Sequence, residues 1–309
     1  MLGEKEKIII PLKEDRPPRP IKIGVVGVPG GYSSEKLADA LAALTGFRCL
    51  IDPSQFFCDL TRGTFSCNGL DLADLDGLVI KKLGPTYAPH LLDRLDLLAH
   101  LANKGVKIFS RPQNISRVIN RLSCTLILAE AGFPLPPTII TEDFQAAAKA
   151  VASFGRAVLK PLFSSKAKGM MVLEDGPGVK DALLDYQAAG NNLFYIQKYL
   201  DLGGRDFGLA FLGGEYLAAY ARVGRAGSWN TSTSSGGVYS CYQPNREMID
   251  LAQRAQNLFG LDFTSVDVAE TAQGPVIFEV SAFGGFRGLK EGCGLDAAEH
   301  FARYIIDNI

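Results

Sequence analysis

The sequence predicts a parallel α/β unit followed by a larger α+β unit. From residue 21 to 111, strand-length apolar runs alternate with helical patterns, which is typical of a parallel sheet covered by helices. Beyond residue 194, short segments separated by glycine turns indicate mainly antiparallel strands. The 309 residues amount to about two domains of chain and are ample for a large core.

The first unit is preceded by residues 1–20, a charged stretch ending in several prolines. We expect this extension to lie outside the fold, with room for one short strand. Ser33 or Ser34 is suited to cap the first helix, and the unit ends near Arg111 and Pro112. Strands are predicted at 21–27, 47–51, 77–80 and 106–109, and helices at 33–44 and 90–103.

The second unit has a different pattern. Gly213-Gly214 forms a two-residue hairpin turn between two strands, and Asn245 caps a helix whose apolar residues share one face. The helices are predicted at 116–131, 144–154 and 246–259, and the strands at 157–160, 170–174, 207–212, 216–222, 264–270 and 276–281.

The composition limits the classes of function. Lys and Arg number 32 and Asp and Glu 33, which gives a net charge of −1. Nucleic acid and anionic membranes both demand a basic surface, so neither is expected as a partner. No apolar run approaches the roughly 20 residues that cross a bilayer, and residues 1–20 have no signal-peptide core. We therefore expect a soluble cytoplasmic protein.

Cysteine and histidine offer little for catalysis. The six cysteines include no CxxC pair, so reduced thiols are expected. The three histidines lie in helix-like stretches without a neighbouring ligand. Chemistry must therefore rely on carboxylates, lysine, arginine and backbone amides.

The last predicted hairpin brings two carboxylates together. If its turn centres on Gln273, Asp267 lies directly opposite Glu279. The alternate positions then face the core, namely Val266, Val268, Val276, Phe278 and Val280. Two facing carboxylates repel, so a cation should lie between them, and Mg²⁺ prefers such oxygens and shares them with phosphates. Two solvated carboxylates on an exposed face explain the pattern equally well.

Two loops are candidates for binding phosphate. Lys160 ends an apolar strand, and the small and basic residues 164–169 after it can fold over a triphosphate. The order is not that of a Walker loop, and an exposed basic hairpin is the alternative. The glycines of 24–31, with Asp52 ending the next strand, suggest a dinucleotide loop. However, their spacing is not GxGxxG and Pro29 occupies the turn, so a simple turn or substrate loop is favoured.

Ten short segments in a fixed order resemble the ATP-grasp superfamily, and the most similar branch is that of the RimK-type carboxylate–amine ligases. The segments are NR at 120–121, GFPLP at 132–136, VLKP at 158–161, SSKAKGM at 164–170, IQKY at 196–199, GRD at 204–206, AR at 221–222, N to GG at 230–237, VDV at 266–268 and FEVS at 278–281. SWNTSTSSGG and EVSAFGGFRGL are also similar to the "GAK system" ATP-grasp proteins, which are named for a proposed gene set.

The resemblance covers roughly residues 21–309 and implies an ATP-grasp fold. It implies a Rossmann-like pre-ATP-grasp domain at 21–111, a small lobe with a connecting helix at 112–198, and a large lobe with the magnesium site at 199–309. The implied activity joins a carboxylate to an amine through an acyl phosphate and releases ADP and phosphate. ATP and Mg²⁺ or Mn²⁺, small-molecule or peptide substrates, a homodimer or homotetramer, and proteins of the gene system are the implied partners.

The resemblance also implies a role for each matching residue. These roles are phosphate binding for Lys160, Ser164, Ser165, Lys168 and Arg121, adenine binding for Gln197, Lys198 and Tyr199, a place near the nucleotide for Asp206, contact with the transferring phosphoryl group for Arg222 and Asn230, and metal binding for Asp267, Glu279 and Ser281. Arg287, in a glycine-rich loop, is expected to touch substrate.

Three positions depart from the family pattern. Ser281 replaces the usual metal-binding asparagine, Lys198 replaces an acidic residue, and Gly208 stands where the family has an arginine. These departures keep open an ATP-binding regulatory protein without ligase chemistry. The loop at 24–31 keeps open a dinucleotide-dependent oxidoreductase. Neither substrate can be named from the sequence.

Overall fold

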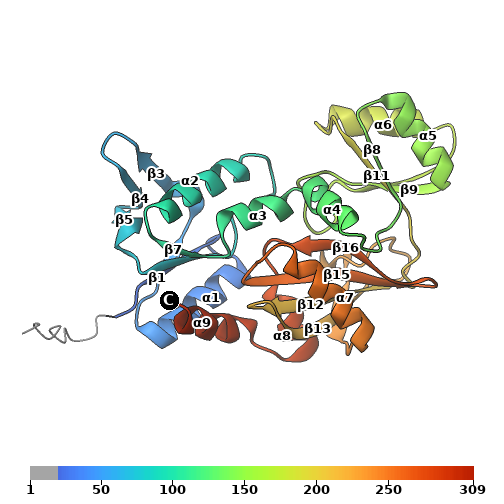
Figure 1. Ribbon diagram of the computed structural model, residues 1–309. Coiled ribbons are helices and arrows are strands. Elements are labelled where there is room, and N and C mark those ends of the chain that lie inside the picture. The colour runs from blue at the N-terminus through green and yellow to red at the C-terminus, as the bar shows by residue number, and fades with distance from the viewer. Residues whose placement is uncertain (1–19) are drawn as a thin grey trace, which may run out of the picture.

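The N-terminal unit contains the parallel sheet that the sequence predicts (Figure 1). The structure, a computed structural model, describes residues 20–309, so the short strand predicted within the extension lies outside the described residues. The sheet has the order β2 (Leu50–Ile51), β1 (Ile23–Val26), β6 (Gly77–Ile80) and β7 (Lys107–Phe109), all parallel. Helices α1 (Tyr32–Thr45) and α2 (Leu91–Asn103) connect its strands.

Two features of this unit differ from the predictions. Gly31 is the N-cap of α1 and provides no side-chain cap. Ser34 is buried and its Oγ instead accepts a hydrogen bond from the Val28 amide at 3.1 Å, so it holds the preceding turn. A small antiparallel sheet was also not predicted, formed by β3 (Phe56–Asp59), β4 (Thr64–Cys67) and β5 (Leu70–Asp71).

The helix predicted at 116–131 is two helices, α3 (Pro112–Ile119) and α4 (Arg121–Glu130). Asn120 separates them because its backbone is extended, with φ −92° and ψ 121°. Its side chain accepts a hydrogen bond from the Leu122 amide at 2.8 Å and caps α4. The break places Arg121 in the first turn of α4, next to the functional site described below.

The small lobe is an antiparallel sheet with two helices and its own apolar core (Figure 1, upper right). The core joins the sheet to the helices through Ala147, Leu159, Leu183 and Ile196. The sheet has the order β10 (Met171–Glu174), β9 (Arg156–Leu159), β11 (Phe194–Lys198) and β8 (Thr138–Thr141), and its helices are α5 (Phe144–Phe154) and α6 (Val179–Ala188).

The large lobe is a five-stranded antiparallel sheet. Its strands are β14 (Val238–Cys241), β13 (Glu215–Val223), β12 (Arg205–Leu212), β15 (Phe263–Thr271) and β16 (Gly274–Ser281), and its helices are α7 (Arg246–Asn257), α8 (Phe286–Cys293) and α9 (Ala297–Asp307). The predicted cap is present, because the Asn245 side chain accepts from the Met248 amide.

Two helices, α9 and α4, pack against a different unit from the one to which the predicted domain boundaries assign them. The last helix, α9, returns to the N-terminal unit and lies against α1, so both ends of the described chain share one core (Figure 1). Helix α4 lies against β16 of the large lobe and contributes to the large core there. The boundaries 21–111, 112–198 and 199–309 stay predictions.

The last hairpin places Asp267 opposite Glu279, as predicted, but by another route. Its turn is tighter than predicted, because Thr271 pairs with Gly274, and the register next to the turn is thereby shifted by one residue. A β-bulge next to Asp267 then shifts the register by one residue and restores the pair. Phe278 therefore lines the cavity and not the core as predicted, while Ile277 is fully buried.

The structure gives a steric reason for Gly208, which stands where the family has an arginine. A Cβ built at this position would lie 2.5 Å from Cζ of its cross-strand neighbour Tyr220, which is itself buried. We expect Gly208→Ala to lower the free energy of unfolding by about 1–3 kcal/mol, as overpacking does. Chemical denaturation measures this, with Gly176→Ala as the control because a Cβ there meets open space. Equal effects of the two changes would contradict the steric explanation.

Candidate active site

A cavity of about 330 Å³ lies where the two lobes meet the N-terminal unit. Most residues with a predicted role line it. They are Arg121, Lys160, Ser164, Ser165, Gln197, Lys198, Tyr199, Asp206, Arg222, Asn230, Asp267, Glu279 and Ser281. Segments separated by more than 150 residues thus converge on one site, as the resemblance implies.

Two predicted residues do not line the cavity. Lys168 is exposed in its loop, and its neighbour Lys166 lines the cavity instead. Arg287 lies in the first turn of α8, where its guanidinium faces the ring of Tyr32 at 5.0 Å and Glu291 at 3.7 Å. The glycine-rich stretch that was expected to be a loop becomes helical at Phe286, and this turns Arg287 away from the cavity.

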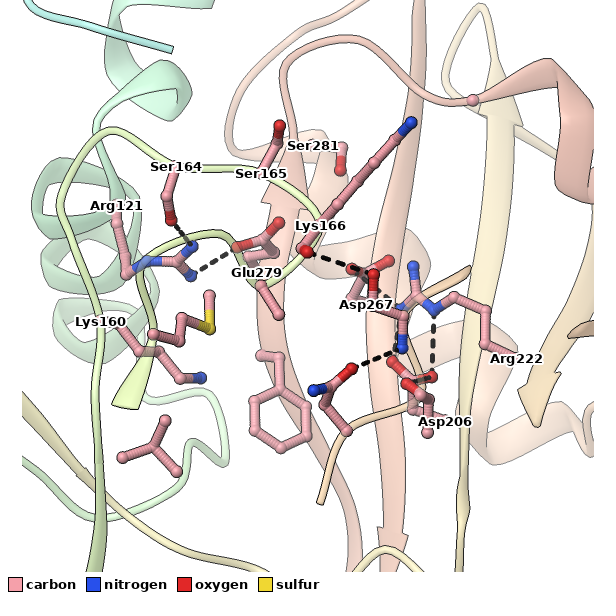
Figure 2. Close-up of a pocket in the computed structure, with 18 of the residues that line it drawn as sticks. Arg121, Lys160, Ser164, Ser165, Lys166, Asp206, Arg222, Asp267, Glu279 and Ser281 are labelled. Carbon is pink, nitrogen blue, oxygen red and sulfur yellow. Dashed lines mark hydrogen bonds and ion pairs between the residues drawn. The ribbon is translucent and has the colours of Figure 1, made fainter. Parts of the chain in front are cut away.

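Arg121 joins the phosphate-loop candidate to the last hairpin (Figure 2). Its guanidinium donates to Oε2 of Glu279 at 2.6 Å, to Oγ of Ser164 at 3.3 Å and to the Pro161 carbonyl at 3.3 Å. The Arg121 side chain is 6% exposed and that of Glu279 is 34% exposed, so the buried arginine meets its carboxylate at the water-accessible wall of the cavity.

Arg222 binds two carboxylates on neighbouring strands (Figure 2). It forms a bidentate pair with Asp206, which faces it across β12 and β13, and its Nη2 lies 3.0 Å from Oδ2 of Asp267. Thr231 donates to Asp206 at 2.6 Å and holds that carboxylate in place. Asp267 and Glu279 are therefore each paired with an arginine. A cation was predicted because these two carboxylates repel each other, and the arginines already offset part of that repulsion.

The donor set still fits a magnesium ion. Oδ1 of Asp267 is buried and lacks a hydrogen-bond partner among the described residues. Glu279 lies across the hairpin, and the hydroxyl of Ser281 belongs to the same cavity wall. Within residues 20–309, no group of three or more His, Cys, Asp or Glu side chains is arranged to hold a metal. Mg²⁺ nevertheless binds commonly through one or two carboxylates together with substrate phosphates, and two carboxylates are what this site offers.

Lys160 is a buried cation at the small-lobe side of the cavity. Its ammonium donates to Oε1 of Gln197 and lies 4.8 Å from the centre of the Phe278 ring. Burial, and then the nearby charge of Arg121, lower the pKa of Lys160 to about 7. An anionic ligand would reverse this shift, because it favours the charged form.

ATP binding is therefore expected to weaken as the pH rises above about 7, since neutral Lys160 must take up a proton to meet the phosphates. At pH 8 binding should take up about one proton at this site. Calorimetry in two buffers that differ in ionisation enthalpy measures the uptake, and Lys160→Met should abolish it. Proton uptake that persists in this variant would assign it to another group.

The strand predicted to bind adenine has limited free hydrogen-bonding groups. The amide of Lys198 donates to the Pro137 carbonyl at 2.8 Å, and that of Tyr199 donates to the Arg156 carbonyl at 2.9 Å. These two amides are therefore already engaged within the small lobe. Lys198 is exposed, whereas the neighbouring Gln197 is buried in the cavity wall.

The phosphate-loop candidate is held by the serine-rich segment of the large lobe. Lys166 and Ala167 have positive φ, 54° and 59°, which is uncommon for residues with side chains. The Lys166 carbonyl accepts hydrogen bonds from the hydroxyls of Ser232 and Ser234 at 3.2 and 3.0 Å. Asn230 shapes the same segment, because its side chain accepts from the Ser232 amide at 3.0 Å. The loop is therefore fixed across the cavity from both lobes.

Sequence reasoning missed the contribution of the N-terminal unit. Lys82 and Tyr87 line the cavity and follow the carboxyl end of β6. The available signal was their position, since ligands of parallel sheets bind beyond the carboxyl ends of strands. Residues 24–31, the dinucleotide-loop candidate, do not line this cavity, and the Gly31 amide closes a turn there onto the Val28 carbonyl.

The sequence from 118 to 305 matches the RimK-like ATP-grasp domain. The chain belongs to this family. It is 28% identical over 268 residues to the tetrahydromethanopterin:α-L-glutamate ligase of Methanosarcina acetivorans, covering 78% of this chain and 83% of that protein. It is 26% identical over 294 residues to the ribosomal protein bS6–L-glutamate ligase of Salmonella paratyphi B, covering 92% and 95%.

The fold is likewise that of ATP-grasp ligases. The ATP-grasp ligase PsnB, in complex with a phosphomimetic variant of its minimal precursor, Mg and ADP, superposes with a TM-score of 0.73 at 18% identity, covering 94% of this chain and 99% of that one. The predicted fold class is thus confirmed. None of the helices in residues 20–309 is both long and apolar enough to span a membrane.

Proposed function

We propose that the protein is an ATP-dependent carboxylate–amine ligase that forms an amide bond through an acyl phosphate and releases ADP and phosphate. The arrangement around Arg222 best supports this proposal. Two carboxylates hold this arginine on the cavity wall, where it faces the side that carries Lys160 and the loop at 164–169. Bringing two anions together is the main obstacle to such a reaction, and fixed positive groups reduce that cost.

The residues of the cavity have distinct roles in this proposal. Lys160, Ser164, Ser165 and Arg121 bind the ATP phosphates, and Gln197 to Tyr199 border the adenine. Arg222 and Asn230 contact the phosphoryl group as it moves to the substrate carboxylate. Asp267, Glu279 and Ser281 would hold Mg²⁺ or Mn²⁺, which when bound supplies positive charge to the phosphate oxygens. Lys168 and Arg287 are not included, because neither lines the cavity.

The substrates are proposed by class. Both relatives described above are named as L-glutamate ligases, one for a small molecule and one for a ribosomal protein. We therefore propose an amino acid as the amine substrate, with L-glutamate the first to test, and a small molecule or peptide as the carboxylate. A homo-oligomeric state, a cytoplasmic location and partners from the GAK system stay predictions.

The cavity favours catalysis over a purely regulatory role. Ser281 lines the cavity and still offers an oxygen beside the carboxylates proposed to hold the metal. Lys198 is exposed, and the buried hydrogen bond from Lys160 to Gln197 forms in its presence. These two of the three departures from the family pattern thus leave in place the groups that the proposed chemistry needs.

ADP release tests the proposal. The purified protein with ATP and Mg²⁺ should release ADP only when L-glutamate and a pool of carboxylates are added together, and mass spectrometry should detect a product lighter than its two substrates by one water. Arg222→Met should lose this activity, whereas Arg205→Met, which removes an exposed arginine paired with Glu270, should keep it. ATP binding without amine-dependent ADP release in the wild type, over a broad panel of amino acids, would contradict the proposal.

A further inference from the structure

Lys82 is a cation that the N-terminal unit presents to the cavity. It lies two residues beyond the end of β6, and its ammonium lies 5.5 Å from the centre of the Tyr87 ring and 5.2 Å from that of Phe283. Both rings line the same cavity, so the ammonium stands between two aromatic faces at its wall. Lys82 therefore reaches the cavity from the N-terminal unit.

The Lys82 ammonium differs from the other enclosed cations of the cavity, which each have a carboxylate or an amide oxygen as a partner. Arg121 and Arg222 are paired with carboxylates, and Lys160 donates to Gln197. Within residues 20–309, the Lys82 side chain has neither an ion pair nor a hydrogen bond. Burial, and then the like charge of Lys166, lower its pKa to about 8. Such a group gains from an anion that arrives with a ligand.

The surroundings of Lys82 indicate which anion this is. Tyr87 lies close enough to Glu279 and Arg121 for their charges to act on its phenol, so this end of the cavity adjoins the metal-site candidate. The groups proposed for phosphate come from the small lobe and α4, whereas Lys82 comes from a different unit of the chain. Two aromatic rings suit the apolar stem of an organic acid better than a phosphate chain, which prefers several donors.

We propose that Lys82 binds a carboxylate of the non-nucleotide substrate, which is an acidic amino acid or peptide end, with Tyr87 and Phe283 flanking its stem. This inference rests on the proposed function, because it names the residue that positions the substrate of the same site. The carboxylate belongs either to the amine substrate or to the acyl substrate, and the test separates the two sources.

Calorimetry on the full chain loaded with AMPPNP and Mg²⁺ tests the proposal with two probes. L-glutamate represents the amine substrate, and N-acetyl-L-glutamate represents an acyl substrate without a free amine. Lys82→Met should weaken at least one probe by about tenfold or more, the scale of a charged hydrogen bond. Lys82→Arg should recover most of the affinity, and AMPPNP should bind each variant as tightly as the wild type. Lys36→Met, at an exposed lysine of the same unit, is the control.

Each outcome decides the proposal. Weaker AMPPNP binding with unchanged probes would assign Lys82 to the phosphates and overturn it. Equal losses in the Lys36 and Lys82 variants, or no binding of either probe to the wild type, would also overturn it. Probe binding that depends on Lys82 in a protein that releases no ADP would support Lys82 while contradicting the ligase proposal. Thermal unfolding shows that a loss does not reflect misfolding.

Discussion

Lys160→Met is expected to slow ATP-dependent turnover by about 10²-fold or more, which is the scale of losing one charge donor at a transition state. The side chain is buried and faces the cavity, and its single charge has no carboxylate bound to it among the described residues. Methionine keeps the length and the apolar stem but removes the ammonium. Steady-state kinetics with saturating substrates measures the loss.

A control variant separates this role of Lys160 from a general effect of removing positive charge near the cavity. Lys168→Met removes an exposed lysine from the neighbouring loop and should leave turnover within a few-fold of the wild type. Lys160→Met should remain folded, because burial already penalises the charged form of this lysine. Wild-type turnover in Lys160→Met would remove Lys160 from the phosphate-binding group.

Asp267→Asn and Glu279→Gln are each expected to abolish turnover that depends on Mg²⁺. Each change removes one of two carboxylates at a site where the described residues offer no third acidic ligand. Metal titrations monitored by ADP release check this, and higher Mn²⁺ concentrations should restore little activity. Full metal-dependent activity in both variants would show that the metal binds elsewhere.

The two variants should differ in stability, because the arginines beside them differ. Glu279→Gln leaves the buried Arg121 without its carboxylate, so the free energy of unfolding should fall by about 1–3 kcal/mol. Asp267→Asn leaves Arg222 paired with Asp206 and should be as stable as the wild type or more stable. Repulsion between the two carboxylates alone would make both variants more stable, whereas their different arginine partners make the variants differ.

The pH dependence of stability checks the same asymmetry. Burial raises the pKa of Asp267 to about 6, above its usual value, even though the charge of Arg222 opposes the shift. The charged form is thus disfavoured in the folded state, and stability should fall as the pH rises from about 4 to 6. Denaturation of wild type and Asp267→Asn at pH 4 and pH 8 should show that the asparagine variant lacks this decrease. An equal decrease in both would contradict the assignment to Asp267.

Local sequence patterns were sufficient for most of the elements and for the facing carboxylates of the last hairpin. The β1–β6 sheet, α5, α7 and the Gly213-Gly214 turn follow from apolar periodicity and from caps that act within a few residues. The pairing of Asp267 with Glu279 also followed, although the shorter turn and the bulge contributed opposite shifts of one residue. Side chains alternate between the two faces of a β-strand, so a register shift of one residue would change which residues face each other. The shift at the turn is cancelled by the shift at the bulge, and Asp267 therefore still faces Glu279.

The charge partners and the substrate side of the cavity depended on the tertiary structure. Arg121 meets Glu279 across 158 residues of sequence, and only the packing of α4 against β16 brings them together. Arg287 looked free because its glycine-rich segment was predicted as a loop, yet a helix turns it toward Tyr32. Lys82 follows the carboxyl end of β6, where ligands of parallel sheets bind, but only the packing of the units places it at the same cavity as the other site residues. Periodicity and capping act over a few residues, whereas ion pairs and cavity walls join segments far apart in the chain, so local patterns could supply the residues of this site but not their partners.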